Sequence, residues 1–345
     1  MTHTLITRTT EVVLPDAVEP DGLEVRTRDL PAPAPGQVVL RMEATGVSFA
    51  EQQMRRGKYY DQPPYPFVPG YDLVGTVVAA GPGVDAGLTG RRFAAVTKTG
   101  GWATHVLVEA ADLVPVPAGV SAAAAETVVV NGITAWQMLH RLAKVRSGGT
   151  IVVLGANGGV GSTLVQLARH AGIRVIGTAA QRHHHAVREL GATPVDYRDP
   201  GMYDRIRSLA PDGVDAVFDH VGGPGVQQSW QLLRRGGTLV SYGTAATKDE
   251  EGSSRLPVLK LFAQLKLWHT LPNHRSAYFY DFWAGRRRLD TFRRRLAEDL
   301  TAVFRLLADG VLSPQIAARI PLTEAASALT LAESRTVAGK VILVP

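Results

Sequence analysis

The sequence predicts a two-domain α/β protein, with a β-rich part and a separate doubly wound parallel sheet. Its length of 345 residues is more than one hydrophobic core usually serves. Residues 1 to about 125 carry short apolar runs interrupted by proline and glycine, which is typical of β-structure. From about residue 128 to 245, strand-like runs alternate with helical patterns, which indicates parallel strands joined by right-handed crossovers.

The β-rich part contains three apolar runs that we expect to be strands, VVLRMEATGV, LVGTVVAAG and THVLVE. The proline-rich stretches LPAPAPG and DQPPYPFVPG are expected to be loops or turns. The end of the chain predicts a strand, a helix and a strand, from QIAARIP to GKVILVP. Because a final strand needs a partner sheet, we expect this end to rejoin the β-rich part.

The alternating part predicts five strands separated by four helices. The strands are expected at TIVVLGA, IRVIGTA, TPVDY, GVDAVFDHVGG and TLVSYG. The helices are expected at GSTLVQLARHAG, HHHAVRELGA, MYDRIRSLAP and VQQSWQLLRRGG, with glycine stops at Gly172 and Gly191. Residues 246–310 predict further helices, most clearly at FAQLKLWHT and LAEDLTAVFRLLADG.

Composition excludes several classes of function. The chain has no cysteine, so disulfides, thiolate catalysis and cysteine-ligated zinc are excluded. The net charge of +6 includes an arginine-rich run from Arg286 to Arg295, which we interpret as a solvated helix face. A phosphate-bearing substrate or an acidic carrier is the alternative for this run, and no nucleic-acid motif accompanies it. The adjacent histidines 183–185 point in different directions on a helix and do not share a metal ion.

The N-terminal sequence gives an expectation about location. MTHTLITRTTEVVL lacks the charged start, apolar core and small-residue cleavage site of a secretory signal. No apolar run approaches the roughly 20 residues that a membrane helix needs. We therefore expect a cytoplasmic protein with no membrane partner.

The strongest motif is a glycine-rich turn in IVVLGANGGVGSTLVQLARHAG. Gly155, Gly158, Gly159 and Gly161 stand between a predicted strand and a predicted helix, together with Asn157 and Val160. Without side chains the backbone can turn tightly and approach a pyrophosphate, which the helix N-terminus attracts. The strand–turn–helix context and the βα units that follow favour a dinucleotide site over a purely structural turn.

The end of the second predicted strand favours NADPH over NADH. NAD-specific sites place Asp or Glu here to bind the ribose 2′-hydroxyl, whereas this chain has the stretch GTAAQRH, residues 177–183. Arg182, or His183 if it is protonated, can pair with a 2′-phosphate. Thr178, in the same stretch, is expected to be a further cofactor-binding residue. The alternative is that Arg182 and His183 are ordinary surface residues at a helix start.

These motifs identify a resemblance that covers nearly the whole chain. VSFAEQQMRRGKYY, PYPFVPGYDLVGTVVAAGPGV, GANGGVG, LGATPVDYR, GVDAVFDHVGG and GKVILVP occur in the order seen in the medium-chain dehydrogenase/reductase superfamily, in its zinc-free, zeta-crystallin-like quinone oxidoreductase branch. The resemblance implies a GroES-like β-barrel catalytic domain, residues 1–127 and 300–345. It also implies a Rossmann-type NADPH-binding domain, residues 128–299, with a helical, aromatic-rich segment at 246–299. It further implies a homodimer that reduces quinones or α,β-unsaturated carbonyls with NADPH.

The resemblance also allows a check of the zinc positions of related alcohol dehydrogenases. The three ligand positions fall on Ser48, Tyr71 and Val130, and the acids beside the first two fall on Glu51 and Asp72. Serine, tyrosine and valine do not form a zinc site. We therefore expect no metal.

Without a metal, the chemistry requires a proton or hydrogen-bond donor at the substrate. Hydride attack on an enone builds negative charge on the carbonyl oxygen, and a donor placed there lowers the barrier. Tyr59, the tyrosine of the branch's RxGxY motif, is the leading candidate; a cleft-lining aromatic is the alternative. Ser48 is the second catalytic candidate, although it replaces an asparagine usual in the branch. Weaker candidates are Tyr60, Gln53 and Tyr71.

Further cofactor contacts are implied by position in the family pattern. Thr134 is expected at the nicotinamide and Tyr197 near the adenosine phosphate. Two loops that follow strands are expected to contribute His220, Val221, Gly222, Ser241, Tyr242 and Gly243. Lys340 is expected either to reach the cofactor or to be an exposed lysine.

Two other functions remain open at this point. One is a biosynthetic ene- or imine-reductase that acts on a natural-product intermediate. The other is a non-redox protein that binds NADPH structurally and serves as a cyclase or interaction module. Aromatic residues between 262 and 283 are expected mainly to pack in a core or a dimer contact, and a minority to line a substrate pocket.

Overall fold

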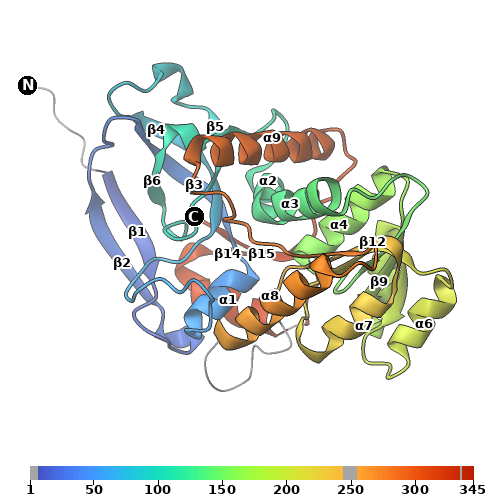
Figure 1. Cartoon of the computed structure of the whole chain (residues 1–345). Helices are drawn as coiled ribbons and strands as arrows, with labels where there is room; N and C mark the ends of the chain where they lie inside the picture. Colours follow the sequence, from blue (N-terminus) through green and yellow to red (C-terminus); the bar gives the residue numbers. More distant parts are fainter. Residues whose placement is uncertain (1–6, 244–254, 335) are drawn as a thin grey trace, which may run out of the picture. The chain divides into compact units, whose positions relative to one another are not determined.

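The computed structural model describes residues 7–243, 255–334 and 336–345 of the chain (Figure 1). The chain divides into two compact units, Met1–Ile133 with Gly285–Pro345 and Thr134–Ala284. Residues 128–133 and 285–299, which we expected in the second domain, belong to the first unit. Of the expected helical segment 246–299, residues 246–254 lie outside the described residues. No helix within the described ranges is both long and apolar enough to cross a membrane.

The first unit is built on a 7-stranded sheet in the order β14-β15-β3-β4-β5-β7, with β6 paired to β3. Its strands are β3 (Gln37–Val47), β4 (Asp72–Ala80), β5 (Arg92–Val96), β6 (His105–Glu109), β7 (Val114–Pro115), β14 (Ile316–Pro321) and β15 (Lys340–Val344). A separate pair joins β1 (Thr7–Val13) to β2 (Glu24–Leu30). The terminal strand β15 runs antiparallel to β3, so the predicted return of the chain end to the β-rich part is confirmed.

Alternating apolar residues give this sheet its core. Leu40 on β3, Leu73 on β4, Leu343 on β15 and Trp102 are fully buried in one hydrophobic cluster. The indole of Trp102 also donates a hydrogen bond of 3.0 Å to the carbonyl of Gly46. The helices that lie wholly in this unit are α1 (Phe49–Arg55), α2 (Ala122–Thr127), α9 (Leu289–Ala308) and α10 (Ala325–Glu333). The chain passes into the second unit within α3 (Val129–Trp136).

The second unit is a 6-stranded parallel sheet in the order β10-β9-β8-β11-β12-β13. Its strands are β8 (Thr150–Val153), β9 (Arg174–Ala179), β10 (Ala192–Asp196), β11 (Val214–Asp219), β12 (Leu233–Ser241) and β13 (Ser276–Phe279). Its helices are α4 (Gly159–His170), α5 (His184–Leu190), α6 (Met202–Leu209), α7 (Val226–Gln231) and α8 (Arg255–Thr270). The predicted parallel, doubly wound sheet is confirmed, including the stops at Gly172 and Gly191, which adopt positive φ angles.

Two elements differ from the sequence prediction. The helix expected across VQQSWQLLRRGG ends at Gln231, and β12 begins at Leu233. Leu233 pairs with Val214 of β11 and is buried there. These residues therefore join the sheet and do not continue the helix α7. The strand β13 lies in a region where we expected helices, and it extends the sheet beyond β12.

The arginine-rich and aromatic segments are placed by local packing. Arg293 on α9 donates a 2.7 Å hydrogen bond to Asp112, whereas Arg286 to Arg288 are exposed. In the second unit the rings of Trp230 and Trp268 stack at 5.0 Å, which is core packing, while Phe262 is 49% exposed.

Candidate functional site

The glycine-rich turn follows β8 and requires glycine at two positions. Gly155 has a φ of +70°, and a Cβ atom there would lie 2.5 Å from Cε1 of His220. At Gly161 a Cβ atom would lie 2.1 Å from the carbonyl oxygen of Gly155, because α4 packs directly on the turn. Any side chain at these positions would push the helix or His220 away from the turn.

Thr178 at the end of β9 fixes this turn in place. Its buried hydroxyl accepts a hydrogen bond of 3.0 Å from the backbone N–H of Gly155. Its carbonyl accepts a second bond of 2.9 Å from the N–H of Ala156. The predicted cofactor residue Thr178 therefore positions the turn.

The turn leads into an N-terminus of α4 that has no side-chain cap. Gly158 is the N-cap residue and supplies no side-chain acceptor for the first-turn N–H groups. Asn157, Gly159 and Val160 are partly exposed at this end. Uncapped N–H groups at the start of a 12-residue helix form an anion-binding site of the kind that holds a pyrophosphate.

The loop after β11 is held by a residue that sequence reasoning missed. Asp219 is buried, and its carboxylate accepts hydrogen bonds from the N–H groups of Val221 (2.8 Å) and Gly222 (2.9 Å). It also accepts a bond of 2.7 Å from the hydroxyl of Ser229. An acid at the end of an apolar strand, just before the HVGG stretch, was the available signal.

The loop after β12 packs against His220, which belongs to the loop after β11. A Cβ atom on Gly243 would lie 2.6 Å from the carbonyl oxygen of His220, so Gly155, His220 and Gly243 meet. The ring of Tyr242 lies 5.9 Å from that of His220. Ser241 is fully buried, and its hydroxyl has no hydrogen-bond partner among the described residues. A buried hydroxyl without a partner is costly, so a bound polar ligand fits here.

His220 is neutral in this arrangement. Its Nδ1 donates to the carbonyl of Leu154 at 3.1 Å, and burial lowers the pKa of its imidazole. Burial also raises the pKa of Tyr242, so its phenol stays protonated. The ring pair therefore presents hydrogen-bonding groups and no charge.

The cation at the start of α5 is Arg182. Burial, and then the charge of Arg182, lower the pKa of His183, so a protonated His183 is not favoured. The Arg182 Nε donates to Nε2 of His183 at 3.1 Å.

Tyr197, at the end of β10, is 48% exposed and has the Arg198 guanidinium 5.7 Å from its ring centre. The remaining predicted contact, Thr134, is buried on α3.

In the first unit, Ser48 and Glu51 cap α1. The hydroxyl of Ser48 accepts from the N–H of Ala50 at 3.1 Å and donates to the Glu51 carboxylate. Glu51 in turn accepts from the N–H of Ser48 at 2.9 Å and from the N–H of Tyr71 at 2.7 Å. Burial raises the pKa of Glu51. These contacts form a capping box, so the Ser48 hydroxyl already has a structural task.

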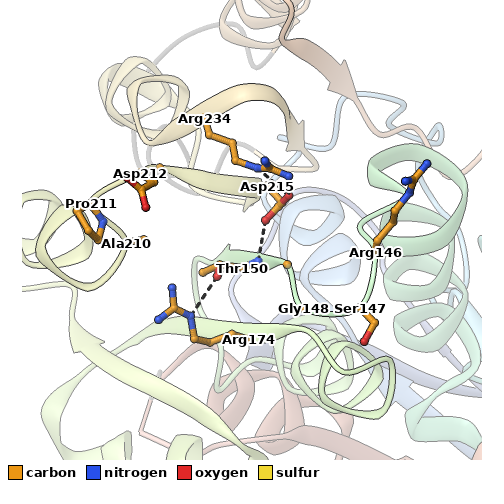
Figure 2. Close-up of a pocket in the computed structure, with 12 residues that line it drawn as sticks. Arg146, Ser147, Gly148, Thr150, Arg174, Ala210, Pro211, Asp212, Asp215 and Arg234 are labelled. Carbon is orange, nitrogen blue, oxygen red and sulfur yellow. Dashed lines mark hydrogen bonds and ion pairs between the residues drawn. The ribbon is translucent and has the colours of Figure 1, made fainter.

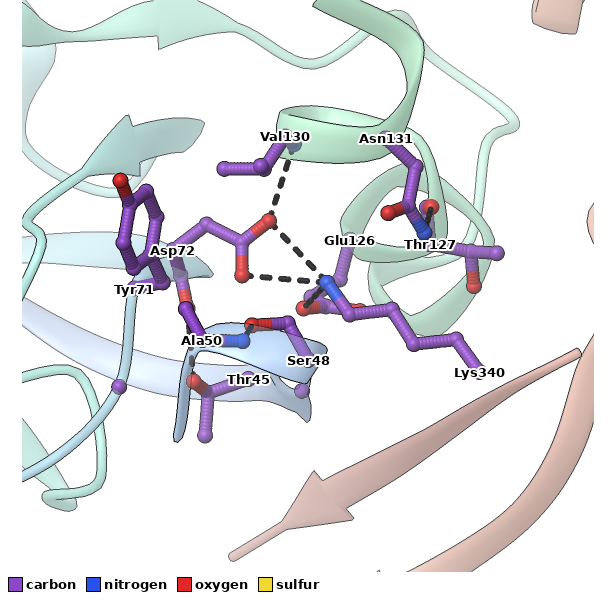
Figure 3. Close-up of polar contacts among 12 residues, drawn as sticks. Thr45, Ser48, Ala50, Tyr71, Asp72, Glu126, Thr127, Val130, Asn131 and Lys340 are labelled. Carbon is purple, nitrogen blue, oxygen red and sulfur yellow. Dashed lines mark hydrogen bonds and ion pairs between the residues drawn. The ribbon is translucent and has the colours of Figure 1, made fainter. Parts of the chain in front are cut away.

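A buried charge cluster lies next to this cap (Figure 3). The ammonium of Lys340 lies 3.1 Å from both carboxylate oxygens of Asp72 and 2.6 Å from Oε1 of Glu126. All three side chains are almost completely buried, so Lys340 is not the exposed lysine that was one of two expectations. Burial alone would lower the pKa of Lys340, but attraction by Asp72 and Glu126 raises it. Its contact with the cofactor stays a prediction.

Tyr59 lies next to a second phenol. Its hydroxyl is 3.0 Å from the hydroxyl of Tyr71, and Tyr59 is 8% exposed. Burial and the neighbouring Tyr71 raise the pKa of Tyr59 well above its ordinary value. The phenol therefore keeps its proton and remains a hydrogen-bond donor at physiological pH.

The three positions that correspond to zinc ligands come together in the fold. Glu51 links Ser48 to Tyr71, and Asp72 accepts from the N–H of Val130 at 3.0 Å. None of these three positions carries a side chain that binds zinc. Within the described part of the chain, no group of three or more His, Cys, Asp or Glu residues is arranged to hold a metal ion.

A parallel sheet with a glycine-lined turn after one central strand, in a chain that also has a β-rich domain, defines the class of two-domain dinucleotide-dependent oxidoreductases. The family described as "Alcohol dehydrogenase GroES-like domain" matches residues 34–118. The family described as "Zinc-binding dehydrogenase" matches residues 190–343.

Individual proteins agree with these matches. The synaptic vesicle membrane protein VAT-1 homolog of Rattus norvegicus is 32% identical over 333 residues, covering 94% of this chain and 80% of that protein. A mycobacterial protein solved in complex with NADPH has a TM-score of 0.82 and 26% identity over 98% of this chain and 100% of that one. A Pseudomonas syringae quinone oxidoreductase has a TM-score of 0.83 and 25% identity over the same shares.

The chain belongs to the medium-chain dehydrogenase/reductase superfamily, in its quinone oxidoreductase branch. The predicted combination of a GroES-like domain with a Rossmann-type domain is thereby confirmed.

Proposed function

We propose that this protein is an NADPH-dependent, zinc-independent reductase that transfers hydride to a quinone or an α,β-unsaturated carbonyl compound. The observation that carries the proposal is the meeting of Gly155, His220 and Gly243 beside the unpartnered buried hydroxyl of Ser241. A bound dinucleotide would give that hydroxyl a partner and place its pyrophosphate at the uncapped start of α4. The mycobacterial relative solved with NADPH supports the choice of cofactor.

The residues of the second unit would hold NADPH, and the bound cofactor would supply the hydride. Gly155 to Gly161 would bind the pyrophosphate. The loops at 220–222 and 241–243, together with Thr134, would hold the nicotinamide half. Arg182 would pair with the 2′-phosphate, because no carboxylate at the end of β9 repels it. Tyr197 would lie at the adenosine end.

In the first unit, Tyr59 would act on the acceptor. Addition of hydride to an enone or a quinone leaves negative charge on the carbonyl oxygen, which a nearby hydrogen-bond donor stabilises. The raised pKa of Tyr59 keeps this donor protonated, and the Tyr71 hydroxyl at 3.0 Å orients it. Ser48 stays a candidate contact, although its hydroxyl is engaged by Glu51.

Oxidation of NADPH with a panel of acceptors tests the proposal. The panel contains simple quinones, small enones, a bulky enone thioester and a cyclic imine, each followed by stopped-flow absorbance of NADPH. Saturable turnover of a quinone or an enone is the expected result. Oxidation by the imine alone, or tight NADPH binding with no oxidation by any acceptor, would overturn the proposal in favour of an imine reductase or a non-redox protein.

A further inference from the structure

The second unit contains a polar pocket that the proposed cofactor site does not use (Figure 2). Its volume is about 450 Å³. Thr150 and Arg174, the first residues of β8 and β9, line it, so it lies at the amino ends of the parallel strands. The glycine-rich turn follows the opposite, carboxyl end of β8. Three arginines and two aspartates are in its wall, namely Arg146, Arg174, Arg234, Asp212 and Asp215.

One of the two aspartates is already neutralised within the protein. The Asp215 carboxylate accepts from the N–H of Thr150 at 2.8 Å and from Nε of Arg234 at 2.9 Å. Its side chain is 19% exposed, against 54% for Arg234. This pair fixes the wall between β8, β11 and β12 and leaves no net charge of its own.

Arg174 is fixed at the pocket but is not satisfied there. Its Nε donates to the hydroxyl of Thr150 at 3.0 Å, which holds the guanidinium at the rim. The terminal amino groups of Arg174 have no partner among the described residues, and neither does the guanidinium of Arg146. Asp212 is the one remaining anion in the wall of the pocket and is exposed. The unneutralised charges therefore sum to one positive charge.

These features match the chemistry of phosphate recognition. A guanidinium held through Nε presents its two outer amino groups as a fork that fits two oxygens of one anion. Gly148 follows Ser147 with a φ of +84°, and a Cβ atom there would contact nothing within 4 Å, so an anion can approach this backbone. The Ser147 hydroxyl also lines the pocket, on the side of Arg146 (Figure 2).

We propose that this pocket binds a phosphate group, with Arg174 as the bidentate contact. Arg146 lies on the other side of the pocket (Figure 2) and adds positive potential without contacting the group. The volume of about 450 Å³ falls in the range of sites for small organic ligands, which favours a phosphate monoester over free phosphate. The site is separate from the proposed cofactor site, and the inference holds whatever substrate the enzyme reduces.

Calorimetric titration of the purified full chain, saturated with NADPH so that the proposed pyrophosphate and 2′-phosphate positions are filled, tests the proposal. The titrants are inorganic phosphate, glycerol phosphate and sulfate at constant ionic strength. The variants are Arg174→Gln and Arg146→Gln, with Arg182→Gln as the matched control at the proposed 2′-phosphate contact. We expect saturable binding that weakens at least about tenfold in Arg174→Gln and less in Arg146→Gln. Arg182→Gln should bind phosphate as the wild type does, and Arg174→Gln should bind NADPH as the wild type does.

Several results would overturn the assignment. These are no saturable phosphate binding, binding that Arg174→Gln leaves unchanged, or binding that Arg182→Gln removes. Tighter binding of glycerol phosphate than of inorganic phosphate would assign an organic phosphate ester, and the reverse would assign the free ion. Because Arg174 is exposed, the variant should fold, and its melting temperature without phosphate checks this. Arg174→Lys keeps the charge without the fork and should bind between wild type and Arg174→Gln.

Discussion

The side chain of Lys340 reaches Asp72 by crossing over Gly46. Lys340 begins β15 and Asp72 begins β4, and the strand that lies between them is β3. A Cβ atom on Gly46 of β3 would lie 2.2 Å from Cε of Lys340 and 2.4 Å from Oε1 of Glu126. Only glycine leaves room for this crossing, so the buried ion pair requires glycine at position 46.

Removing the ammonium should destabilise the first unit strongly. In Lys340→Met, Asp72 and Glu126 stay buried without a cation, and breaking a buried pair in this way costs about 3–5 kcal/mol. Urea unfolding should show this loss of stability. Asp72→Asn and the double variant complete a cycle in which the double variant loses less than the sum of the two single losses. Additive losses would mean that the two groups do not stabilise each other.

Glu126 should make stability depend on pH. Burial raises the pKa of Glu126 well above its ordinary value of 4.5, so folding takes up a proton. Stability then falls as pH rises from 4.5 through the raised folded pKa, because the unfolded state has already released that proton.

Glu126→Gln isolates this effect, because the amide keeps an oxygen for Lys340 but does not titrate. Its free energy of unfolding, measured by urea titration at a series of pH values above 4.5, should fall less steeply than that of the wild type. Some slope should remain, because burial raises the pKa of Glu51 as well. Identical slopes for the two proteins would show that Glu126 is already ionised in the fold.

Ser48 can be assigned to structure or to catalysis with one substitution. Ser48→Ala removes the N-cap of α1 and should lower the free energy of unfolding by about 1 kcal/mol. We expect turnover to change little, because the hydroxyl is engaged by Glu51 and Ala50. Ser48→Thr keeps a capping hydroxyl and should restore most of the stability. A collapse of turnover at unchanged stability would instead support the catalytic role predicted from the sequence.

The parts of the site that the sequence predicted are those with contiguous signals. The turn from Gly155 to Gly161 lies within seven residues, and its glycine spacing, between a predicted strand and a predicted helix, indicates a phosphate-binding turn. Strand β13 escaped prediction because four residues, SAYF, carry too short a pattern beside the long helix α8. The role of Asp219 was not predicted from the sequence, because one of its partners, Ser229, lies ten positions away on the next helix.

The charge cluster could not be predicted, because its members are distant in sequence. Lys340 is 268 positions from Asp72 and 214 from Glu126, and no local pattern links such residues. The family resemblance located Ser48, Tyr71 and Val130 as one group of positions, but not the hydrogen bonds of Glu51 and Asp72 that join them. The pocket at Arg174 depends in the same way on residues of four separate strands, β8, β9, β11 and β12, that meet at one end of the sheet.

Tyr59 should be needed for turnover over a wide pH range. Tyr59→Phe keeps the ring packing but removes the donor, and we expect kcat to fall by about 10²-fold or more. Since its pKa is raised above the ordinary value of 10, wild-type kcat should not decline through loss of this proton as pH approaches 10. Tyr71→Phe keeps the Tyr59 hydroxyl and should have a smaller effect. A Tyr59→Phe variant that keeps wild-type kcat would show that the Tyr59 ring serves packing rather than proton donation.

Arg182 should set the preference for NADPH over NADH. If its guanidinium pairs with the 2′-phosphate, Arg182→Gln loses a charge-assisted hydrogen bond worth about 1.5–3 kcal/mol, which corresponds to about 10- to 150-fold in affinity. NADH has no 2′-phosphate, so its dissociation constant should not change.

Equilibrium titration of both coenzymes against wild type, Arg182→Gln and His183→Gln measures this difference. His183→Gln should change neither affinity by much, because the lowered pKa of His183 leaves its imidazole uncharged. The preference for NADPH should also weaken with rising salt, since Arg182 is exposed and screening weakens its pairing with phosphate. A loss of NADH affinity equal to that of NADPH would mean that Arg182 supports the start of α5 and does not recognise the phosphate.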